Sequence, residues 1–203
     1  MTMKKMTTAG AMALALVACG GSGNGESAPE PATEATGSST TTEETAPAVG
    51  GIPERGDDAE RASKNGETVA TMGGLTVTVR YGRPNVNGRT IFGGLVPFDS
   101  VWRTGANEAT TITFSAPANF GETAVDAGTY ALFSIPGESE WTLILNRDAE
   151  QWGASRYDES RDAARVTVTP AAHAATEEMT FADDGGLFLR WAETSVPVPV
   201  AAQ

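Results

Sequence analysis

Apolar and polar side chains alternate along several short stretches of residues 63–203, which is the pattern of β-strands with one buried face. In LTVTVRY, residues 75–81, Leu, both Val and Tyr lie on one face, while both Thr and Arg lie on the other. Similar stretches, rich in β-branched and aromatic residues, recur at 110–114, 129–135, 141–146, 165–169, 178–181 and 187–193. Short strands at this spacing predict an all-β fold, a single antiparallel β-sandwich or barrel-like domain.

Turn sequences and a proline-containing segment add to this prediction. Gly-Gly at 73–74, Pro-Gly-Glu-Ser at 136–139 and Asp-Asp-Gly-Gly at 183–186 supply residues suited to hairpin turns. In VPVPV, residues 196–200, alternate prolines remove N–H donors from one side, which predicts an edge strand that resists further strand addition. The only helix predicted is one or two turns within 157–164.

Residues 1–18 form a predicted export signal. Lys4 and Lys5 precede a short apolar run that ends in small residues, and this run is well below the roughly 20 residues needed to span a bilayer. It ends in Leu-Val-Ala-Cys at 16–19, which resembles the lipobox of bacterial lipoproteins. The resemblance implies cleavage before Cys19 and diacylation of its sulfur. The alternative is an ordinary signal peptide with a chance cysteine, but Cys19 is the only cysteine and lies where the lipobox requires it.

A lipidated Cys19 predicts an exported protein whose partner is a lipid bilayer. One acyl chain, such as palmitate, binds a membrane reversibly, whereas two or more hold a protein stably. Gly20 stands where Asp favours retention in the inner membrane of some Gram-negative bacteria. If the organism is Gram-negative, the sequence therefore favours the outer membrane, with the domain facing the periplasm.

Residues 19–62 are expected to form a disordered acidic linker. The segment is rich in Gly, Ser, Thr, Ala, Pro and Glu, has no aromatic residue, and carries nine acidic side chains against Arg55 and Arg61. So little apolar surface cannot offset the entropy lost on ordering. A glycosylated stalk around the threonines at 40–45 is an alternative.

Residues 63–203 form the predicted packed domain, because they contain all four Trp, all three Tyr and all seven Phe. Trp141 and Trp191 alternate in phase with neighbouring leucines and are predicted to be buried, whereas Trp102 and Trp152 lie in predicted loops. The whole chain has a net charge of −12, which argues against nucleic acid as a partner.

The long connection at 82–109 is the candidate site, because irregular segments of this length within a compact domain are commonly functional. Four of the domain's ten basic residues lie between positions 80 and 108, and all four are Arg, which pairs bidentately with carboxylate, phosphate or sulfate. One interpretation is a pocket for a small anionic or polar ligand. The other is architectural, with the arginines paired to acids or carbonyls that hold the loop on the sheet. The predicted ligand-binding residues are the charge donors Arg83, Arg89 and Arg103, the wall Trp102, and the orienting Asn107 and Glu108.

Four segments of the domain carry a family resemblance: VRYGRPNVNGRTIFGGLVPFDSVWRTGANEATTITF, DAGTYALFSIPGESEWTLILN, WGASRYDESRDAARV and LRWAETSVPVP. Together they resemble the bacterial DUF2911 family, a domain of unknown function often found in exported proteins. The resemblance covers residues 63 to about 199. It implies a β-rich fold and marks the segment with Arg, Trp and Asn-Glu as that family's signature. It implies no activity, substrate or catalytic residue.

Catalytic and metal chemistry has few candidates. His173, the only histidine, lies among small residues in a predicted loop, and no Gly-x-Ser-x-Gly turn presents a serine nucleophile. One His without a domain cysteine argues against zinc, and Asp183 and Asp184 suit a hairpin turn as well as calcium. Paired carboxylates for glycoside hydrolysis stay open among Glu108, Asp126, Asp158 and Glu159. No catalytic residue, metal or cofactor is assigned.

The sequence therefore favours a membrane-anchored cell-envelope lipoprotein whose β domain binds a small anionic or polar ligand through the arginine-rich loop. One alternative is an interaction or assembly module for another envelope protein, with the loop purely structural. A further alternative is an uncharacterised hydrolase.

Overall fold

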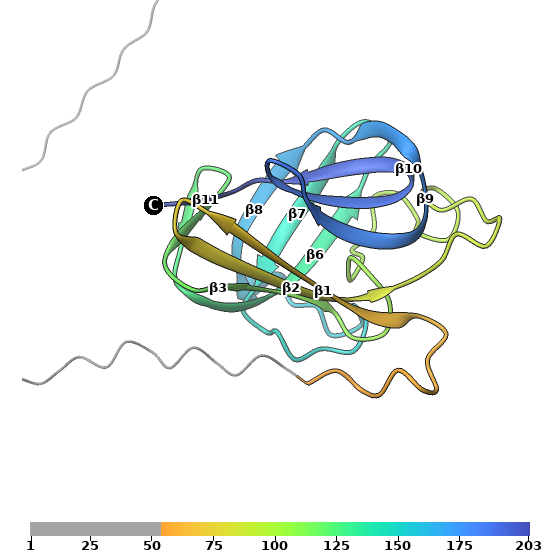
Figure 1. Cartoon of the computed structure of the whole chain (residues 1–203), viewed down its shortest axis with the longest axis horizontal. Coiled ribbons are helices and arrows are strands. Elements are labelled where there is room, and N and C mark those ends of the chain that lie inside the picture. Colours follow the sequence, from red (N-terminus) through yellow and green to blue (C-terminus); the bar gives the residue numbers. More distant parts are fainter. Residues whose placement is uncertain (1–53) are drawn as a thin grey trace, which may run out of the picture. The chain divides into compact units, whose positions relative to one another are not determined.

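The computed structural model describes residues 54–203. The predicted export signal, Cys19 and most of the predicted linker lie outside the described residues. Residues 54–203 form an antiparallel all-β structure, as the alternating pattern predicts (Figure 1). Among them, no helix is long and apolar enough to cross a membrane.

Six strands form the main sheet, and every neighbouring pair is antiparallel. Tight turns at Gly73-Gly74 and after Pro136 join two of the pairs as hairpins, as predicted. In spatial order the strands are β1 (Lys64–Met72), β2 (Leu75–Arg83), β3 (Thr110–Phe114), β6 (Gly128–Pro136), β7 (Trp141–Asn146) and β8 (Asp162–Val168).

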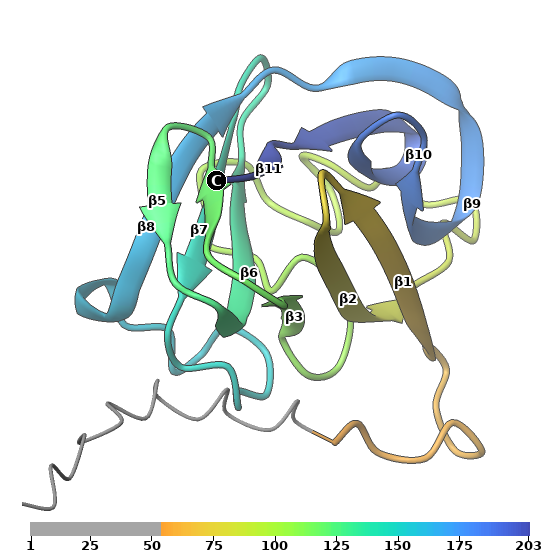
Figure 2. The same cartoon turned by 60° about the vertical axis from the view of Figure 1, so that its left-hand side comes forward.

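Two smaller sheets complete the domain. A long hairpin consists of β9 (Ala171–Asp183) and β10 (Leu187–Val198), and a three-stranded sheet of β11 (Val200–Ala202), β4 (Ala118–Phe120) and β5 (Thr123–Val125). The β9–β10 hairpin lies over one face of the main sheet (Figures 1 and 2). The hydroxyl of Thr68 on β1 donates to the carbonyl of Phe181 on β9 at 2.8 Å, so the hairpin is tied to the edge of that sheet.

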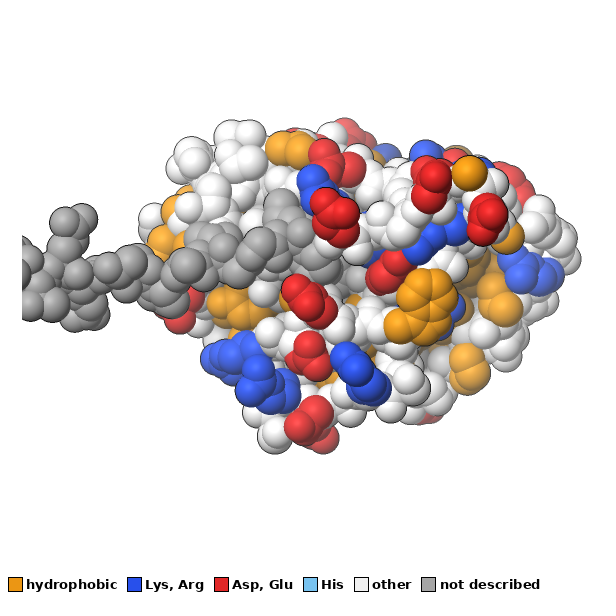
Figure 3. Space-filling model, turned by 90° about the horizontal axis from the view of Figure 1, so that it is seen from below, with side chains coloured by type: hydrophobic (Ala, Val, Ile, Leu, Met, Phe, Trp, Pro, Cys, Tyr) orange, Lys and Arg blue, Asp and Glu red, His pale blue; other side chains and the backbone are white. Residues whose placement is uncertain are grey.

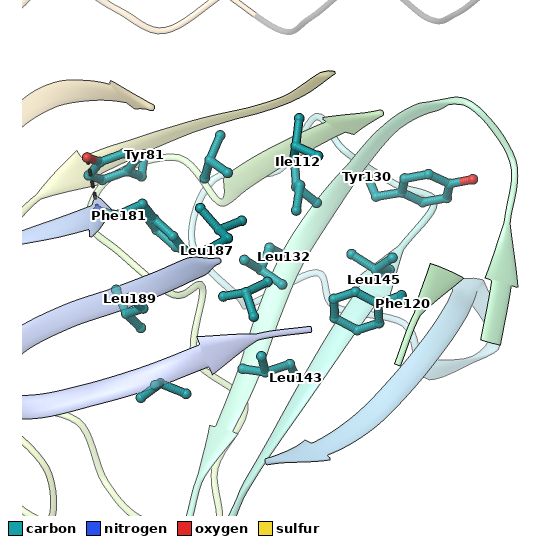
Figure 4. Close-up of a cluster of buried hydrophobic side chains, with 14 of the residues drawn as sticks. Tyr81, Ile112, Phe120, Tyr130, Leu132, Leu143, Leu145, Phe181, Leu187 and Leu189 are labelled. Atoms are coloured by element: carbon teal, nitrogen blue, oxygen red, sulfur yellow. Dashed lines mark hydrogen bonds between the residues drawn. The ribbon is translucent and has the colours of Figure 1, made fainter. Parts of the chain in front are cut away.

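The main hydrophobic core lies between the main sheet and the β9–β10 hairpin. All four apolar side chains of the 75–81 segment are at most 2% exposed, which confirms the alternation seen in the sequence. Leu132 from β6 packs in the same cluster as Leu189 from β10, and the Tyr81 hydroxyl accepts a hydrogen bond from the backbone N–H of Phe181 at 3.1 Å (Figure 4). Trp141 and Trp191 are buried in this core, as predicted.

A smaller apolar cluster covers the opposite face of the main sheet. It contains Ala109, Ala131, Phe133 and Ile144, and the ring of Tyr157 packs edge-on against Phe133 with 5.1 Å between centroids. The central strands β6 and β7 are therefore buried on both faces. This explains why their sequences contain nearly continuous apolar runs rather than strict alternation.

Four strands are not predicted by the alternation. β1 is polar and mostly accessible, and β4, β5 and β11 have three residues each, so none of them shows an apolar period. β9 extends from Ala171, whereas the pattern predicts a strand only at 178–181, because its first half pairs with β10 while staying accessible to solvent. His173 consequently lies in a strand, not in the predicted loop.

The prediction of one or two helical turns within 157–164 is met only in part. Only a single 3-10 turn forms, Glu159–Arg161, and the Asp158 side chain caps it by accepting from the Ser160 N–H at 2.9 Å. β8 begins at Asp162, whose carboxylate accepts from the side-chain amide of Asn146 at 2.7 Å. Pairing with β7 satisfies the backbone from this point, so the helix does not continue.

The connection between β2 and β3 is folded back onto the main sheet. Trp102 exchanges two backbone hydrogen bonds with Ser134 on β6, at 2.7 and 2.9 Å. The Ala106 N–H donates to the carbonyl of Gly82 at 3.3 Å. Only glycine fits at position 82, because a Cβ there would lie 2.2 Å from the Ala106 carbonyl oxygen.

Candidate functional site

Two of the predicted charge donors are engaged with the protein itself. Arg83 closes β2 and forms an ion pair with Glu178 on β9, with 2.6 Å between Nη2 and Oε2. Arg89 donates from Nε to the Val86 carbonyl at 3.0 Å and from Nη2 to the Asn85 carbonyl at 2.5 Å. These contacts hold the first part of the loop, so Arg83 and Arg89 match the architectural interpretation.

Glu108, predicted to orient a ligand, is bound by two arginines from the end of the predicted linker. Its Oε2 accepts from Arg61 Nη1 at 2.6 Å and lies 3.4 Å from Arg55 Nη2, and its Oε1 accepts from Arg61 Nη2 and from the Gly56 N–H. Arg55 is the more deeply placed arginine, with 7% of its side chain exposed. It also donates to the carbonyls of Ala106, Glu108 and Ala109. The contacts of the domain thus begin before the predicted boundary at 63.

The electrostatics of Glu108 follow from these contacts. Burial by itself raises the pKa of its carboxyl, but the hydrogen bonds from Arg61 and backbone N–H groups, with the charge of Arg55, lower the pKa to about 2. Glu108 is therefore a carboxylate at any physiological pH. Its hydrogen-bonding capacity is used by the clamp of Arg55, Arg61 and Glu108, which leaves it little to offer a ligand.

Asn107 shapes the backbone between the clamp and the loop. Its φ of 64° is left-handed, which Asn tolerates better than most residues. Its side-chain amide donates to the Ser63 carbonyl at 3.0 Å, and its own carbonyl accepts from the Gly153 N–H at 3.1 Å. Asn107 therefore joins β1's entry to the 151–154 loop.

Arg103 differs from Arg83, which pairs with Glu178, and from Arg89, which donates to carbonyls, because within residues 54–203 its side chain forms neither an ion pair nor a hydrogen bond. Its Nε is buried without a hydrogen-bond partner, and its Nη1 lies 3.6 Å from the position that a Cβ would take at Gly153. Burial alone lowers the pKa of the guanidinium, with no carboxylate to offset it. Arg103 is thus a partly buried charge whose hydrogen-bonding capacity is not used by the described part of the chain.

The backbone fixes Arg103 from both sides. Trp102 is hydrogen-bonded to β6, and the Arg103 carbonyl accepts from the N–H of Thr110 on β3 at 3.1 Å. Thr104 follows with a φ of 51°, an uncommon value for a β-branched residue, and is fully buried. Its hydroxyl donates to Ser134 at 3.0 Å and its carbonyl accepts from the Thr110 hydroxyl at 2.7 Å. The position of Arg103 is therefore set in advance of any ligand.

Trp102, the residue before Arg103, belongs to a cluster of aromatic side chains. Its ring stacks on Trp191 with 5.9 Å between centroids and 18° between planes, and lies edge-on to Phe92 and Trp141. The Trp102 indole N–H donates to the Gly105 carbonyl at 3.2 Å. The indole N–H of Trp191 has no partner within residues 54–203, although the residue is only 1% exposed. It follows Arg190 at a β-bulge, where Ala192 has a φ of 51°.

A cavity of about 300 Å³ brings these features together. Two arginines and no acidic residue line it, although the chain has a net charge of −12. Three other cavities, of about 270 to 390 Å³, are each lined by at least two glutamates. The lining of this Arg103 cavity is Ser63, Pro84, Arg89, Leu95, Val96, Pro97, Ser100, Val101, Trp102, Arg103, Gly105, Ala106 and Trp191.

A second cavity, of about 310 Å³, lies beside the clamp and is lined by Glu54, Glu150, Gln151 and Trp152 among others. Trp152 is 64% exposed, and the guanidinium of Arg61 lies 5.9 Å from its ring centroid. The carboxylates lining this cavity repel anions. The face that the molecule presents in Figure 3 carries acidic and basic side chains interspersed, with no continuous basic patch.

The described residues contain no cluster of three or more His, Cys, Asp or Glu side chains that could hold a metal ion. The ring of His173 contacts only its own strand, with Nδ1 2.7 Å from the Ala174 carbonyl oxygen. Of the four carboxylates considered for hydrolysis, Glu108 is in the clamp, Asp158 caps the 3-10 turn, and Glu159 pairs with Arg165 at 3.1 Å.

The structure therefore brings Trp102 and Arg103 together, with Arg89 at the same cavity, and places Arg83, Asn107 and Glu108 in contacts that hold the loop. Sequence reasoning missed Arg55 and Arg61, although they are the only basic residues of an otherwise acidic segment. It also missed Trp191 as a cavity residue, because its strand phase indicated only burial.

Comparison with curated proteins and with solved structures finds no match. The family model described as a protein of unknown function (DUF2911) matches residues 63–200, which includes the whole Arg103 cavity. The match covers more than half of the chain and spans all eleven strands except the last residues of β11. The chain belongs to the DUF2911 family.

Proposed function

We propose that this protein is a cell-envelope lipoprotein, anchored through Cys19, whose β domain binds a small anionic ligand in the Arg103 cavity. The single observation that supports ligand binding is Arg103 itself, a partly buried guanidinium with no ion pair among residues 54–203. A buried charge without a partner is costly, and an anion removes that cost by pairing with it.

The cavity residues have different roles in this proposal. Arg103 supplies the positive charge and the N–H donors, and charge-assisted hydrogen bonds of this kind contribute about 1.5–3 kcal/mol each. Trp102 and Trp191 form the aromatic wall, and the indole N–H of Trp191 is a second donor. Arg83, Asn107 and Glu108 keep the loop folded and do not touch the ligand.

The proposal is tested by ligand-dependent thermal stabilisation. A panel of small anions is screened against the wild-type domain, and a ligand at 100 times its Kd is expected to raise Tm by about 5 °C or more. Arg103→Gln should abolish that increase while the unliganded Tm stays near the wild-type value, because Arg103 makes no ion pair that holds the fold. Arg80→Gln is the matched control, since Arg80 pairs only with Glu67 on the neighbouring strand.

The result that would overturn the proposal is equally specific. If Arg103→Gln responds to every anion as the wild type does, the cavity is not the binding site. If Arg103→Gln unfolds where Arg80→Gln does not, Arg103 has a structural role instead.

A further inference from the structure

We infer that the Arg103 cavity takes a monocarboxylate with a flat apolar body, and not inorganic phosphate or sulfate. This inference rests on the proposed function and narrows its ligand to a chemical class. It depends on three properties of the cavity: the number of available charges, the type of its polar groups, and the character of its remaining walls.

The available charge matches a monoanion. Arg103 is the partly buried arginine of the cavity and has no carboxylate partner. Arg89 is exposed to solvent, and two of its three guanidinium nitrogens are already bound to the carbonyls of Asn85 and Val86. Water screens an exposed charge, so Arg89 contributes little to a buried ion. A doubly charged phosphate or sulfate would therefore leave one negative charge without compensation.

The polar groups of the cavity that have spare capacity are mainly donors. The guanidinium of Arg103 donates only, and so does the indole N–H of Trp191, which is 1% exposed and has no partner among residues 54–203. No acid lines the cavity to accept a proton or a hydrogen bond from a ligand. A ligand headgroup made of acceptors alone, such as an ionised carboxylate, suits a cavity lined by such donors. The planar guanidinium fork also fits the two oxygens of a carboxylate.

Apolar side chains form much of the remaining wall of this small cavity. Two near-parallel indoles, Trp102 and Trp191, form one wall, and Leu95, Val96 and Val101 are among the other lining residues. Such walls gain free energy by covering apolar ligand surface, which phosphate and sulfate do not have. At about 300 Å³ the cavity is at the small end of ligand pockets, so the apolar body is expected to be small.

Titration of the full chain, followed by tryptophan fluorescence, tests this inference. The probes are benzoate, hexanoate, acetate, benzamide, inorganic phosphate and sulfate. Benzoate should bind most tightly and hexanoate, whose apolar chain is not flat, more weakly; benzamide, which has the ring of benzoate without the charge, should bind at least about tenfold more weakly than benzoate. Phosphate and sulfate should not bind at concentrations that saturate the carboxylate.

Variants of Arg103 and Trp102 assign the result to the charged and the apolar halves of the cavity. Arg103→Gln should lower the affinity for benzoate to that for benzamide. Arg103→Lys should keep part of the affinity that Arg103→Gln loses. Trp102→Leu should lower the affinity for benzoate but leave the affinity for acetate unchanged, because acetate has almost no apolar surface for the tryptophan to cover. Trp152→Leu is the matched control, since Trp152 lies at the other cavity.

The possible failures are distinguishable. If phosphate or sulfate binds in an Arg103-dependent way and carboxylates do not, this inference is overturned while the proposed anion site stands. If acetate binds as tightly as benzoate, the apolar part of the inference is wrong. If no probe binds, or binding ignores Arg103, both the inference and the proposed function fail.

Discussion

At the scale of single residues, three arginines of one connection have different surroundings and therefore different roles. Arg83 has Glu178 within 2.6 Å, Arg89 has two carbonyls of its own turn, and the Arg103 side chain has neither an acidic nor a carbonyl partner among residues 54–203. The chemistry of the three guanidinium groups is identical. What distinguishes a loop clamp from a candidate ligand donor is which acceptors the fold places nearby.

The clamp on Glu108 makes the stability of the domain depend on pH. The pKa of Glu108 is about 2 in the folded protein against an ordinary value of 4.5, so its stabilisation is fully present above pH 4.5 and is lost as pH falls toward 2. This shift corresponds to about 3 kcal/mol at most, which solvent screening of the partly exposed pair reduces to about 1–2 kcal/mol.

The measurement is the free energy of unfolding between pH 2 and pH 7. The difference in the free energy of unfolding between wild type and Glu108→Gln should be largest at pH 7 and should shrink steadily below pH 4.5. Glu67→Gln, which removes an exposed ion pair with Arg80, should show a much smaller difference. A difference between wild type and Glu108→Gln that does not change with pH would contradict the role of the carboxylate.

At the scale of elements, the candidate site depends on how closely the β2–β3 connection approaches the end of β2. Gly82 permits this approach, because its missing Cβ leaves room for the Ala106 carbonyl. The hydrogen bond from the Ala106 N–H to Gly82, together with the pairing of Trp102 with Ser134, keeps the connection on the sheet. Isolated β-bridges and backbone hydrogen bonds thereby hold a long irregular connection against the sheet.

Gly82→Ala should therefore destabilise the domain by about 1–3 kcal/mol, because a Cβ at 2.2 Å from a carbonyl oxygen forces the backbone to shift. Chemical denaturation measures the loss. Gly186→Ala is the control, since its nearest neighbour would be a Phe188 ring atom at 3.4 Å, an ordinary contact. Equal stability of the two variants would mean that the loop does not need this approach.

At the scale of the whole molecule, the proposed anchor and the folded domain make separate contributions. Cys19 lies outside the described residues, whereas Arg55, near the start of the described residues, contacts the folded domain. Anchoring by acyl chains requires only the thiol and its surrounding signal, whereas ligand binding requires the packed domain. The two proposed activities can therefore be lost independently.

Cys19→Ser should move the protein from the membrane fraction to the soluble fraction of the cell, because the substituted chain has no thiol for acylation. Immunoblotting of the separated fractions measures the change, and mass spectrometry of the wild-type N-terminus should show an acylated cysteine. The domain of the variant should keep its wild-type Tm. Retention of Cys19→Ser in the membrane fraction would rule out the lipid as the sole anchor.

Local side-chain patterns decided the fold class. Alternation such as that of residues 75–81 requires no partner to be recognised, since a strand with one buried face repeats every two residues. The family resemblance was likewise readable from short motifs, and the family match covers residues 63–200. Of the one or two helical turns predicted within 157–164, only a single 3-10 turn forms, because the pairing of β8 with β7, a long-range contact, overrides local preference.

The candidate site could be predicted only in part, since the chain showed which loop carries the arginines but not what each of them touches. Arg55 and Glu108 are far apart along the chain, and their ion pair exists because the segment at 54–62 folds back along the loop. The same applies to Trp191, which the β9–β10 hairpin carries to Trp102 and Arg103. The sequence alone determined an antiparallel β domain with an arginine-rich connection, because those properties are local. Only the tertiary structure decided which guanidinium stayed without a partner, because ion pairing depends on distances between segments that the sequence does not order.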